Sequence, residues 1–211
     1  MSFLETTRIA YDTVAESYAE FIEDDLPNRP VERSVLGLFA EVAGGGPVVE
    51  VGCGQGRVAA HLDALGVDAA GIDLSPEMIA QARKRYPGLR FEVGTMTALD
   101  LPDAGLAGLV AWYSIIHVPP ALHPDLFLEF RRVLRPGGFL LLAFHVGDET
   151  RHVTAAYGHD NLSYDAHRLP PERVADQLVE AGFAMVAQTI RQPIGWEPMP
   201  QAFLLATLGT D

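Results

Sequence analysis

The stretch Val48-Val49-Glu50-Val51-Gly52-Cys53-Gly54-Gln55-Gly56-Arg57 decides the fold. Its short β-branched run predicts a buried strand, and the three glycines after it predict a tight turn that leads into a helix. Glycine permits a positive φ and lets a ligand approach the backbone closely. This order of strand, glycine-rich turn and helix is typical of sites that bind a nucleotide cofactor. The alternative is a plain tight turn with no ligand.

Short apolar runs and amphipathic stretches alternate along the rest of the chain, which predicts βαβ units and a mostly parallel sheet. After the strand at residues 48–51, strands are predicted over residues 69–72, 89–93, 109–113, 139–144, 184–190 and 203–208. Helices are predicted over residues 6–22, 31–42, 57–65, 75–86, 126–134 and 170–181. The last two strands are joined by a loop at residues 192–200, so we expect an antiparallel strand at the edge of the sheet.

Length predicts a single domain over residues 1–211, with a helical lid over 1–45, an α/β core over 46–211 and an irregular segment over 145–169. The net charge of −13 disfavours nucleic acid and anionic membranes as partners, because such a surface repels phosphates. No apolar run is long enough to span a bilayer. The single cysteine, Cys53, excludes a disulfide within the chain. With no signal-peptide pattern at the N-terminus, we expect a cytoplasmic monomer or homodimer.

Asp73 follows the second predicted strand, 21 residues after Gly52. An acid at this place can accept hydrogen bonds from the hydroxyls of a ribose. The alternative is that Asp73 caps the next helix, in competition with Ser75, which precedes Pro76 at the first helical position. A ribose-binding acid does not by itself distinguish a nicotinamide cofactor from an adenosyl cofactor.

Taken together, four blocks resemble the class I S-adenosylmethionine-dependent methyltransferases. They are residues 50–56 (EVGCGQG), 71–79 (GIDLSPEMI), 99–102 (LDLP) and 134–138 (LRPGG). The resemblance implies a three-layer α/β/α sandwich around a Rossmann-like, seven-stranded mixed sheet of order 3-2-1-4-5-7-6, with strand 7 antiparallel. It also implies that S-adenosyl-L-methionine is the cofactor and S-adenosyl-L-homocysteine the product.

The resemblance further implies a set of cofactor-binding residues, from the glycine turn, the ends of the strands and the lid. They are Tyr18, Glu50, Gly52, Cys53, Gly54, Gly56, Asp73, Leu74, Met78, Thr95, Met96, Thr97 and Ser114. The glycines would line the methionyl and ribose parts, and Leu74 and Met78 would flank the adenine. Thr95 departs from the family pattern, since many relatives carry an acid there. For Met78 and Tyr18 ordinary packing is the alternative.

Methyl transfer from a sulfonium is an in-line displacement, and it needs a base only when the acceptor must lose a proton. His117, after the fourth predicted strand, is the candidate base and also a candidate acceptor contact; a structural histidine is the alternative. Tyr11, His145 and Trp196 are the other candidate acceptor contacts. The remaining histidines between residues 145 and 169 show no metal-ligand spacing, so no metal is expected.

These observations favour an enzyme that methylates oxygen or nitrogen of a small molecule. Two alternatives remain: a non-catalytic protein that binds the same cofactor, and an NAD(P)-dependent oxidoreductase. The GxGxG spacing and the terminal pair of strands disfavour the oxidoreductase. No motif identifies the methyl acceptor.

Overall fold

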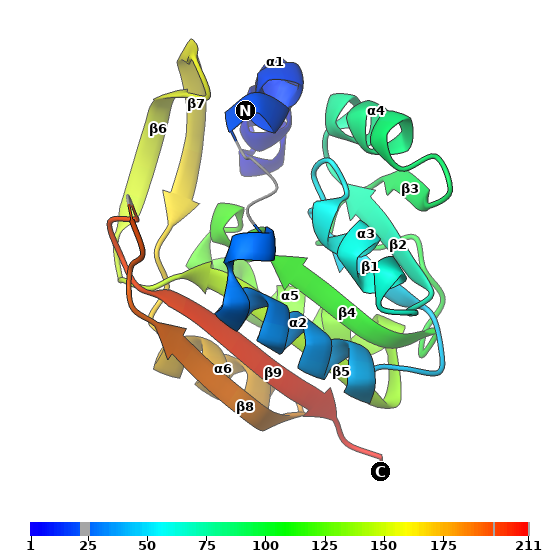
Figure 1. Cartoon of the computed structure of the whole chain (residues 1–211). Helices are drawn as coiled ribbons and strands as arrows, with labels where there is room; N and C mark the ends of the chain where they lie inside the picture. The colour runs from blue at the N-terminus through cyan, green and yellow to red at the C-terminus, as the bar shows by residue number, and fades with distance from the viewer. Residues whose placement is uncertain (22–25, 196, 211) are drawn as a thin grey trace.

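Seven strands form one mixed sheet in the order β3-β2-β1-β4-β5-β9-β8 (Figure 1). The computed structural model describes residues 1–21, 26–195 and 197–210. The strands of the sheet are β1 (Val48–Val51), β2 (Ala69–Asp73), β3 (Arg90–Val93), β4 (Leu106–Trp112), β5 (Leu134–His145), β8 (Phe183–Arg191) and β9 (Gln201–Leu208). β1 to β5 are parallel, and β9 is antiparallel to both of its neighbours. Since β8 and β9 are the sixth and seventh strands of this sheet, the predicted order 3-2-1-4-5-7-6 is confirmed.

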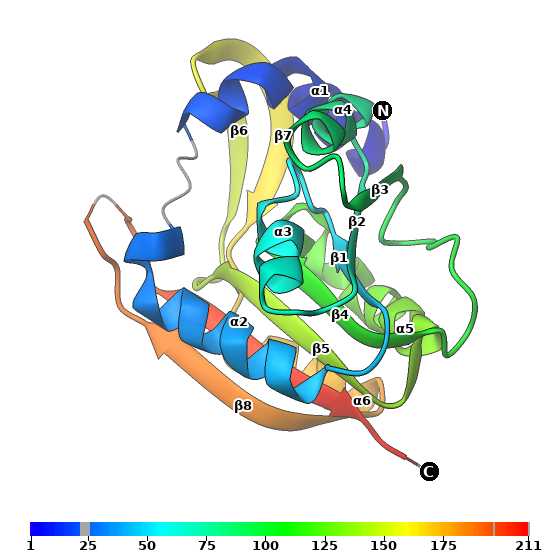
Figure 2. The same cartoon turned by 45° about the vertical axis from the view of Figure 1, so that its right-hand side comes forward.

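Helices cover both faces of the sheet and give the predicted three-layer sandwich (Figure 2). One face carries α2 (Pro30–Val42), α3 (Arg57–Ala64) and α4 (Pro76–Arg85), and the other carries α5 (His123–Val133) and α6 (Pro171–Glu180). Three short 3-10 turns are η1 (Leu26–Asn28), η2 (Ile115–His117) and η3 (Pro120–Leu122). None of the helices in the described ranges is long and apolar enough to cross a membrane.

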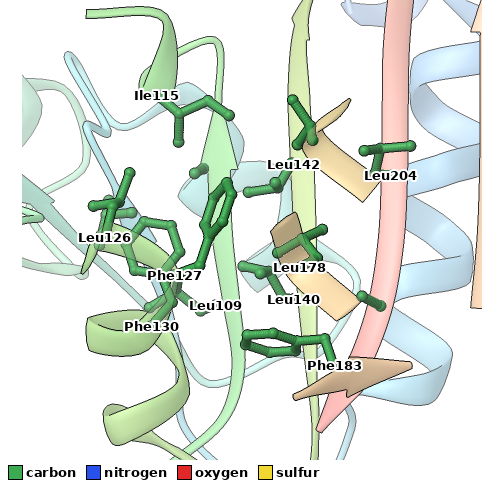
Figure 3. Packing of buried hydrophobic residues seen from close by; sticks show 14 of the residues in the cluster. Leu109, Ile115, Leu126, Phe127, Phe130, Leu140, Leu142, Leu178, Phe183 and Leu204 are labelled. Atoms are coloured by element: carbon green, nitrogen blue, oxygen red, sulfur yellow. The ribbon is translucent and has the colours of Figure 1, made fainter. Parts of the chain in front are cut away.

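The largest core cluster lies between the sheet and the α5/α6 layer (Figure 3). Phe127 and Phe130 of α5 and Leu178 of α6 pack against Leu109 of β4 and Leu140 of β5, and all five side chains are fully buried. Burying one such side chain contributes about 1.5–3 kcal/mol. This packing fixes the central strands and therefore the loops at their carboxyl ends.

β5 begins five residues before its predicted start. The ladder pairs Leu106 with Leu134 and then Gly108 with Phe139, so the intervening residues form a bulge. Gly137 makes the bulge possible because its φ is +74°. The sharp break predicted at this point therefore lies within a strand.

A second, two-stranded sheet is formed by β6 (Thr150–Ala156) and β7 (His159–His167). The prediction of an irregular segment over residues 145–169 is therefore wrong. The alternation of Leu162, Tyr164 and Ala166 with polar residues is a strand signal, and these three side chains face the apolar cluster under α1.

α1 (Phe3–Phe21) packs between α4 and the β6–β7 hairpin rather than on the main sheet (Figure 1). α2, by contrast, belongs to the core, where Leu36 and Phe39 are fully buried against the sheet. A lid was predicted over residues 1–45. Of these residues, α1 covers the carboxyl edge of the sheet.

Candidate active site

A cavity of about 990 Å³ lies at the carboxyl ends of the parallel strands. Residues that follow β1, β2, β4 and β5 line it, and α1 and β7 cover it. Ligands of open α/β sheets bind at this edge. The volume is at the upper end of the roughly 300–1,000 Å³ typical of small-molecule sites, so there is room for two ligands side by side.

The glycine turn after β1 forms one wall of this cavity. Gly52, Gly54 and Gly56 have φ values of +68°, +52° and +79°, which side chains rarely adopt. Gly52 and Gly54 line the cavity. Gly56 is not among the described residues that line it; a Cβ there would lie 2.4 Å from the ring of Phe91, so this glycine allows α3 to pack closely on the sheet.

Asp73 connects this turn to the end of β2. Its Oδ2 accepts the N–H of Gly54 at 2.7 Å, and its Oδ1 accepts the N–H of Ser75 at 2.8 Å. The cap of α4 is Ser75, whose Oγ accepts the N–H of Met78 at 3.0 Å. Burial raises the pKa of Asp73 to about 6, although the backbone N–H groups act in the opposite direction. Asp73 lines the cavity, so its carboxylate can accept further hydrogen bonds from a ligand there.

Glu50 lies beneath the turn and is buried. Its Oε2 accepts the N–H of Ala59 at 2.8 Å, in the first turn of α3. Since Gly56 at the N-cap has no side chain to offer, Glu50 satisfies a donor that would otherwise be unpaired. Burial raises the pKa of Glu50 to about 8.

The raised pKa of Glu50 predicts a pH-dependent stability. Between its ordinary value of 4.5 and about 8, the folded protein holds a proton that the unfolded chain releases, so stability falls as pH rises across this window. The slope for one group is at most about 1.4 kcal/mol per pH unit. Glu50→Gln should lack this contribution, and its free energy of unfolding in urea should rise relative to that of the natural protein from pH 6 to 8. Glu41→Gln, an exposed change on α2, is the control; curves for Glu50→Gln that stay parallel to the natural protein would contradict the assignment.

Four of the predicted cofactor contacts come from the segments that follow β2 and β3. Leu74, Met78, Thr95 and Met96 all line the cavity. Thr97 does not line it in the described part of the chain; its Oγ1 is 2.8 Å from that of Thr95, and its N–H donates to Thr95 Oγ1 at 3.3 Å. Thr97 therefore orients Thr95, the residue at the place where relatives carry an acid.

Ser114 and Cys53 also line the cavity, with different roles. The hydroxyl of Ser114 donates to the carbonyl of Val51 at 2.7 Å and so ties the end of β4 to the end of β1. Burial raises the pKa of the Cys53 thiol, which keeps it protonated and unreactive.

His117 and Tyr11 meet at the roof of the cavity. The Tyr11 hydroxyl is 2.8 Å from His117 Nε2, and His117 Nδ1 is 3.2 Å from the carbonyl oxygen of Asp165. Because a carbonyl can only accept, Nδ1 carries the proton, and Nε2 accepts from Tyr11. Burial lowers the pKa of His117 to about 4. His117 is thus neutral at pH 7, with both nitrogens engaged.

Further aromatic rings surround this pair. Tyr164 of β7 lies 5.6 Å from Tyr11 between ring centroids, and Tyr157, in the turn of the hairpin, lies 4.8 Å from Tyr18. Both hairpin tyrosines line the cavity. They were missed from the sequence because the hairpin itself was missed.

α1 is held in place by the glycine turn and by α4. Gln55, within the turn, donates from Nε2 to the carbonyl of Ala15 at 2.6 Å. Asp12 accepts from the Ser75 hydroxyl at 2.6 Å. The lid helix is therefore bonded directly to the two segments that frame the predicted cofactor site.

An ion-pair cluster beside the cavity joins α2 to the end of β8 and to Glu197. Arg191 bridges Glu32 at 2.8 Å and Glu197 at 2.6 Å, and Arg29 pairs with Glu197 at 2.8 Å. Arg29, Glu32 and Glu197 line the cavity. Trp196, predicted as an acceptor contact, lies outside the described residues.

Comparison with known proteins identifies a family that this chain resembles in sequence and fold. Residues 48–138 match the family described as a methyltransferase domain. This match and the fold support the class I S-adenosylmethionine-dependent methyltransferase family. Magnesium protoporphyrin IX methyltransferase from Synechocystis PCC 6803, a structure with bound S-adenosylmethionine, shares the fold with a TM-score of 0.77 at 14% identity, over 99% of this chain and 98% of that one.

The relatives that are similar in sequence are named for different methyl acceptors. Demethylmenaquinone methyltransferase of Beutenbergia cavernae is 29% identical over 136 residues, which is 63% of this chain and 55% of the relative. Trans-aconitate 2-methyltransferase of Methylobacterium nodulans is 34% identical over 144 residues, which is 65% of this chain and 48% of the relative. The chain thus spans about half the length of these relatives, and their acceptors differ from one another.

Most of the predicted site residues lie around one cavity. Those that line it are Tyr11, Tyr18, Glu50, Gly52, Cys53, Gly54, Asp73, Leu74, Met78, Thr95, Met96, Ser114, His117 and His145. Their roles toward cofactor and acceptor stay predictions. Sequence reasoning missed the hairpin tyrosines, Gln55 and the ion-pair cluster, whose members approach one another only in the folded chain.

Proposed function

We propose that this chain binds S-adenosyl-L-methionine and transfers its methyl group to oxygen or nitrogen of a small-molecule acceptor. One observation carries the proposal: the Gly52–Asp73 end and the Tyr11–His117 end belong to one continuous cavity. The first end offers a ribose acid and close backbone approach, and the second offers aromatic walls for an acceptor. The two ends meet under the lid helix.

The charge of the donor end supports a sulfonium cofactor. Asp73 places an ionised carboxylate beside the turn, whereas Glu50 beneath it, with a pKa of about 8, is mostly protonated at pH 7. A cofactor with a cationic sulfonium and an ammonium group is stabilised there, whereas the pyrophosphate of a nicotinamide dinucleotide is not. When bound, the cofactor supplies an activated methyl group, and the chain supplies position, orientation and exclusion of water.

The lid contacts explain how this chain would exclude water. α1 is bonded to Gln55 in the turn and to Ser75 at the start of α4, so its closed position depends on the segments that hold the cofactor. The Tyr11–His117 bond joins the lid to the end of β4. A closed lid over the donor would leave the acceptor end, between Tyr164 and His145, as the space for the second substrate.

The test is direct. We expect S-adenosylmethionine and S-adenosylhomocysteine to bind in calorimetry, and a radiolabelled donor to yield methylated product with one member of a panel of phenols, organic acids and amines. Tight donor binding with no product across a broad panel would favour a non-catalytic binder. Tight NADH binding with no binding of S-adenosylhomocysteine would overturn the proposal in favour of an oxidoreductase.

A further inference from the structure

His145 ends β5 on the cavity side and faces Gln201, its partner residue at the start of β9. His145 Nδ1 lies 2.8 Å from Gln201 Oε1. The amide of Gln201 is itself held, because its Nε2 donates to the carbonyl of Met199 at 2.8 Å. Gln201 is only 2% exposed, so this orientation is enforced by burial as well as by the hydrogen bond.

This arrangement fixes which nitrogen of His145 carries the proton. Gln201 presents an oxygen, which can only accept, so Nδ1 of His145 must be the donor. Nε2 of the neutral ring is then left with a lone pair. Within the described residues no hydrogen bond reaches Nε2, whereas both nitrogens of His117 are engaged, by Tyr11 and by Asp165. Of the two histidines, His145 is the one with a free basic nitrogen.

The surroundings keep His145 neutral at pH 7. Burial lowers its pKa below the ordinary 6.5, and Arg168 acts in the same direction, while Gln201 and Glu197 oppose the shift. His117 and His167 also line the cavity; burial lowers the pKa of His117 to about 4 and that of His167 below its ordinary value. Tyr113 flanks the imidazole at 5.0 Å between ring centroids. A base in this setting is unprotonated before the reaction.

The position of His145 suits an acceptor that lies next to the donor. β5 is two strands away from β1 in the sheet, which is roughly 10 Å at the usual strand spacing. Gly52, directly after β1, and His145, the last residue of β5, line the same cavity. An acceptor atom between them can face the donor on one side and Nε2 on the other.

We infer that His145 is the general base of the proposed methyl transfer and that Gln201 is its positioning residue; such a base favours an acceptor that must lose a proton, namely a hydroxyl. This inference rests on the proposed function. A lone pair of the acceptor forms the bond to the methyl carbon, the sulfur–methyl bond breaks with its electron pair on sulfur, and the acceptor proton passes to Nε2. The imidazolium so formed keeps its Nδ1 hydrogen bond to Gln201. Alkylation makes the acceptor proton far more acidic, so even a weak base accepts it.

The first test reads the tautomer without any turnover. In ¹⁵N-labelled protein, long-range ¹H–¹⁵N spectra distinguish the two neutral forms of an imidazole, and loss of signals in His145→Asn assigns the ring. We expect Nδ1–H in the natural protein and in Gln201→Glu, which keeps an acceptor, but a mixture in Gln201→Met. Gln188→Met, an exposed change on β8, should leave the spectrum unchanged. A natural protein with Nε2–H at His145 would overturn the inference.

The second test asks whether Nε2 is available and used. Diethyl pyrocarbonate acylates unprotonated imidazole nitrogen, and peptide mass spectrometry should find His145 modified faster than His117; the reverse order counts against the inference. With a hydroxyl acceptor that the panel yields, His145→Asn should lower kcat about 10²–10⁴-fold and leave donor affinity within about twofold. An undiminished kcat would overturn the base assignment. Failure of S-adenosylhomocysteine to bind would instead overturn the proposed function, and the tautomer would still be readable.

Discussion

Asp73→Asn is expected to weaken binding of S-adenosylmethionine by about 10–10²-fold. In this proposal the Asp73 carboxylate accepts from two ribose hydroxyls while it holds the N–H groups of Gly54 and Ser75. Hydrogen bonds to a charged group contribute about 1.5–3 kcal/mol each, and about 1.4 kcal/mol corresponds to a factor of ten. The amide of Asn offers only one acceptor oxygen, and its NH₂ group faces a donor in place of the second oxygen. One of the two hydrogen bonds to the ribose is therefore lost.

Calorimetric titration of donor and product into Asp73→Asn measures the effect. Asp63→Asn, the same change at an exposed position on α3, is the matched control and should bind as the natural protein does. Circular dichroism and thermal unfolding show whether Asp73→Asn keeps the fold, which separates a lost contact from a lost structure. An unchanged dissociation constant in a folded Asp73→Asn would show that the ribose does not lie at Asp73.

The order of the sheet followed from the family resemblance, whereas the elements around the glycine turn were predictable because their signals are local. The apolar run at β1, the glycines after it and the cap at Ser75 each act within a few residues, and the structure has each where the sequence places it. The β6–β7 hairpin was missed although Leu162 and Tyr164 alternate with polar residues. Its apolar side is covered by α1, so the strands are stabilised by a contact that no local pattern reveals.

The roles of the two histidines could not be predicted, because each depends on a distant partner. Tyr11 is 106 residues from His117, and Gln201 is 56 residues from His145. The sequence favoured His117 as the base because it follows the fourth strand, but His145 at the end of β5 lines the same cavity, and neither position shows which ring nitrogen is free. Only the hydrogen bonds made by each ring show which nitrogen is free.

Gly52→Ala and Gly54→Ala form a pair that tests the turn itself, because both positions have positive φ but different surroundings. A Cβ at Gly52 would lie 2.3 Å from Ser114 Cβ and 3.2 Å from Met96 Cε. A Cβ at Gly54 meets no atom of the described chain within 4 Å. Left-handed backbone costs a side-chain-bearing residue about 1–2 kcal/mol, and forcing atoms into a packed site costs about 1–3 kcal/mol more.

We therefore expect Gly52→Ala to lose about 2–5 kcal/mol of unfolding free energy in urea, and Gly54→Ala only about 1–2 kcal/mol. Ser114 cannot step aside without cost, since its hydroxyl bonds the carbonyl of Val51 at 2.7 Å and joins β4 to β1. If the added methyl group moves Ser114, the cavity wall moves with it, so donor affinity should also fall further in Gly52→Ala. Equal losses of stability in the two variants would mean that backbone conformation alone, and not the contact with Ser114, requires glycine after β1.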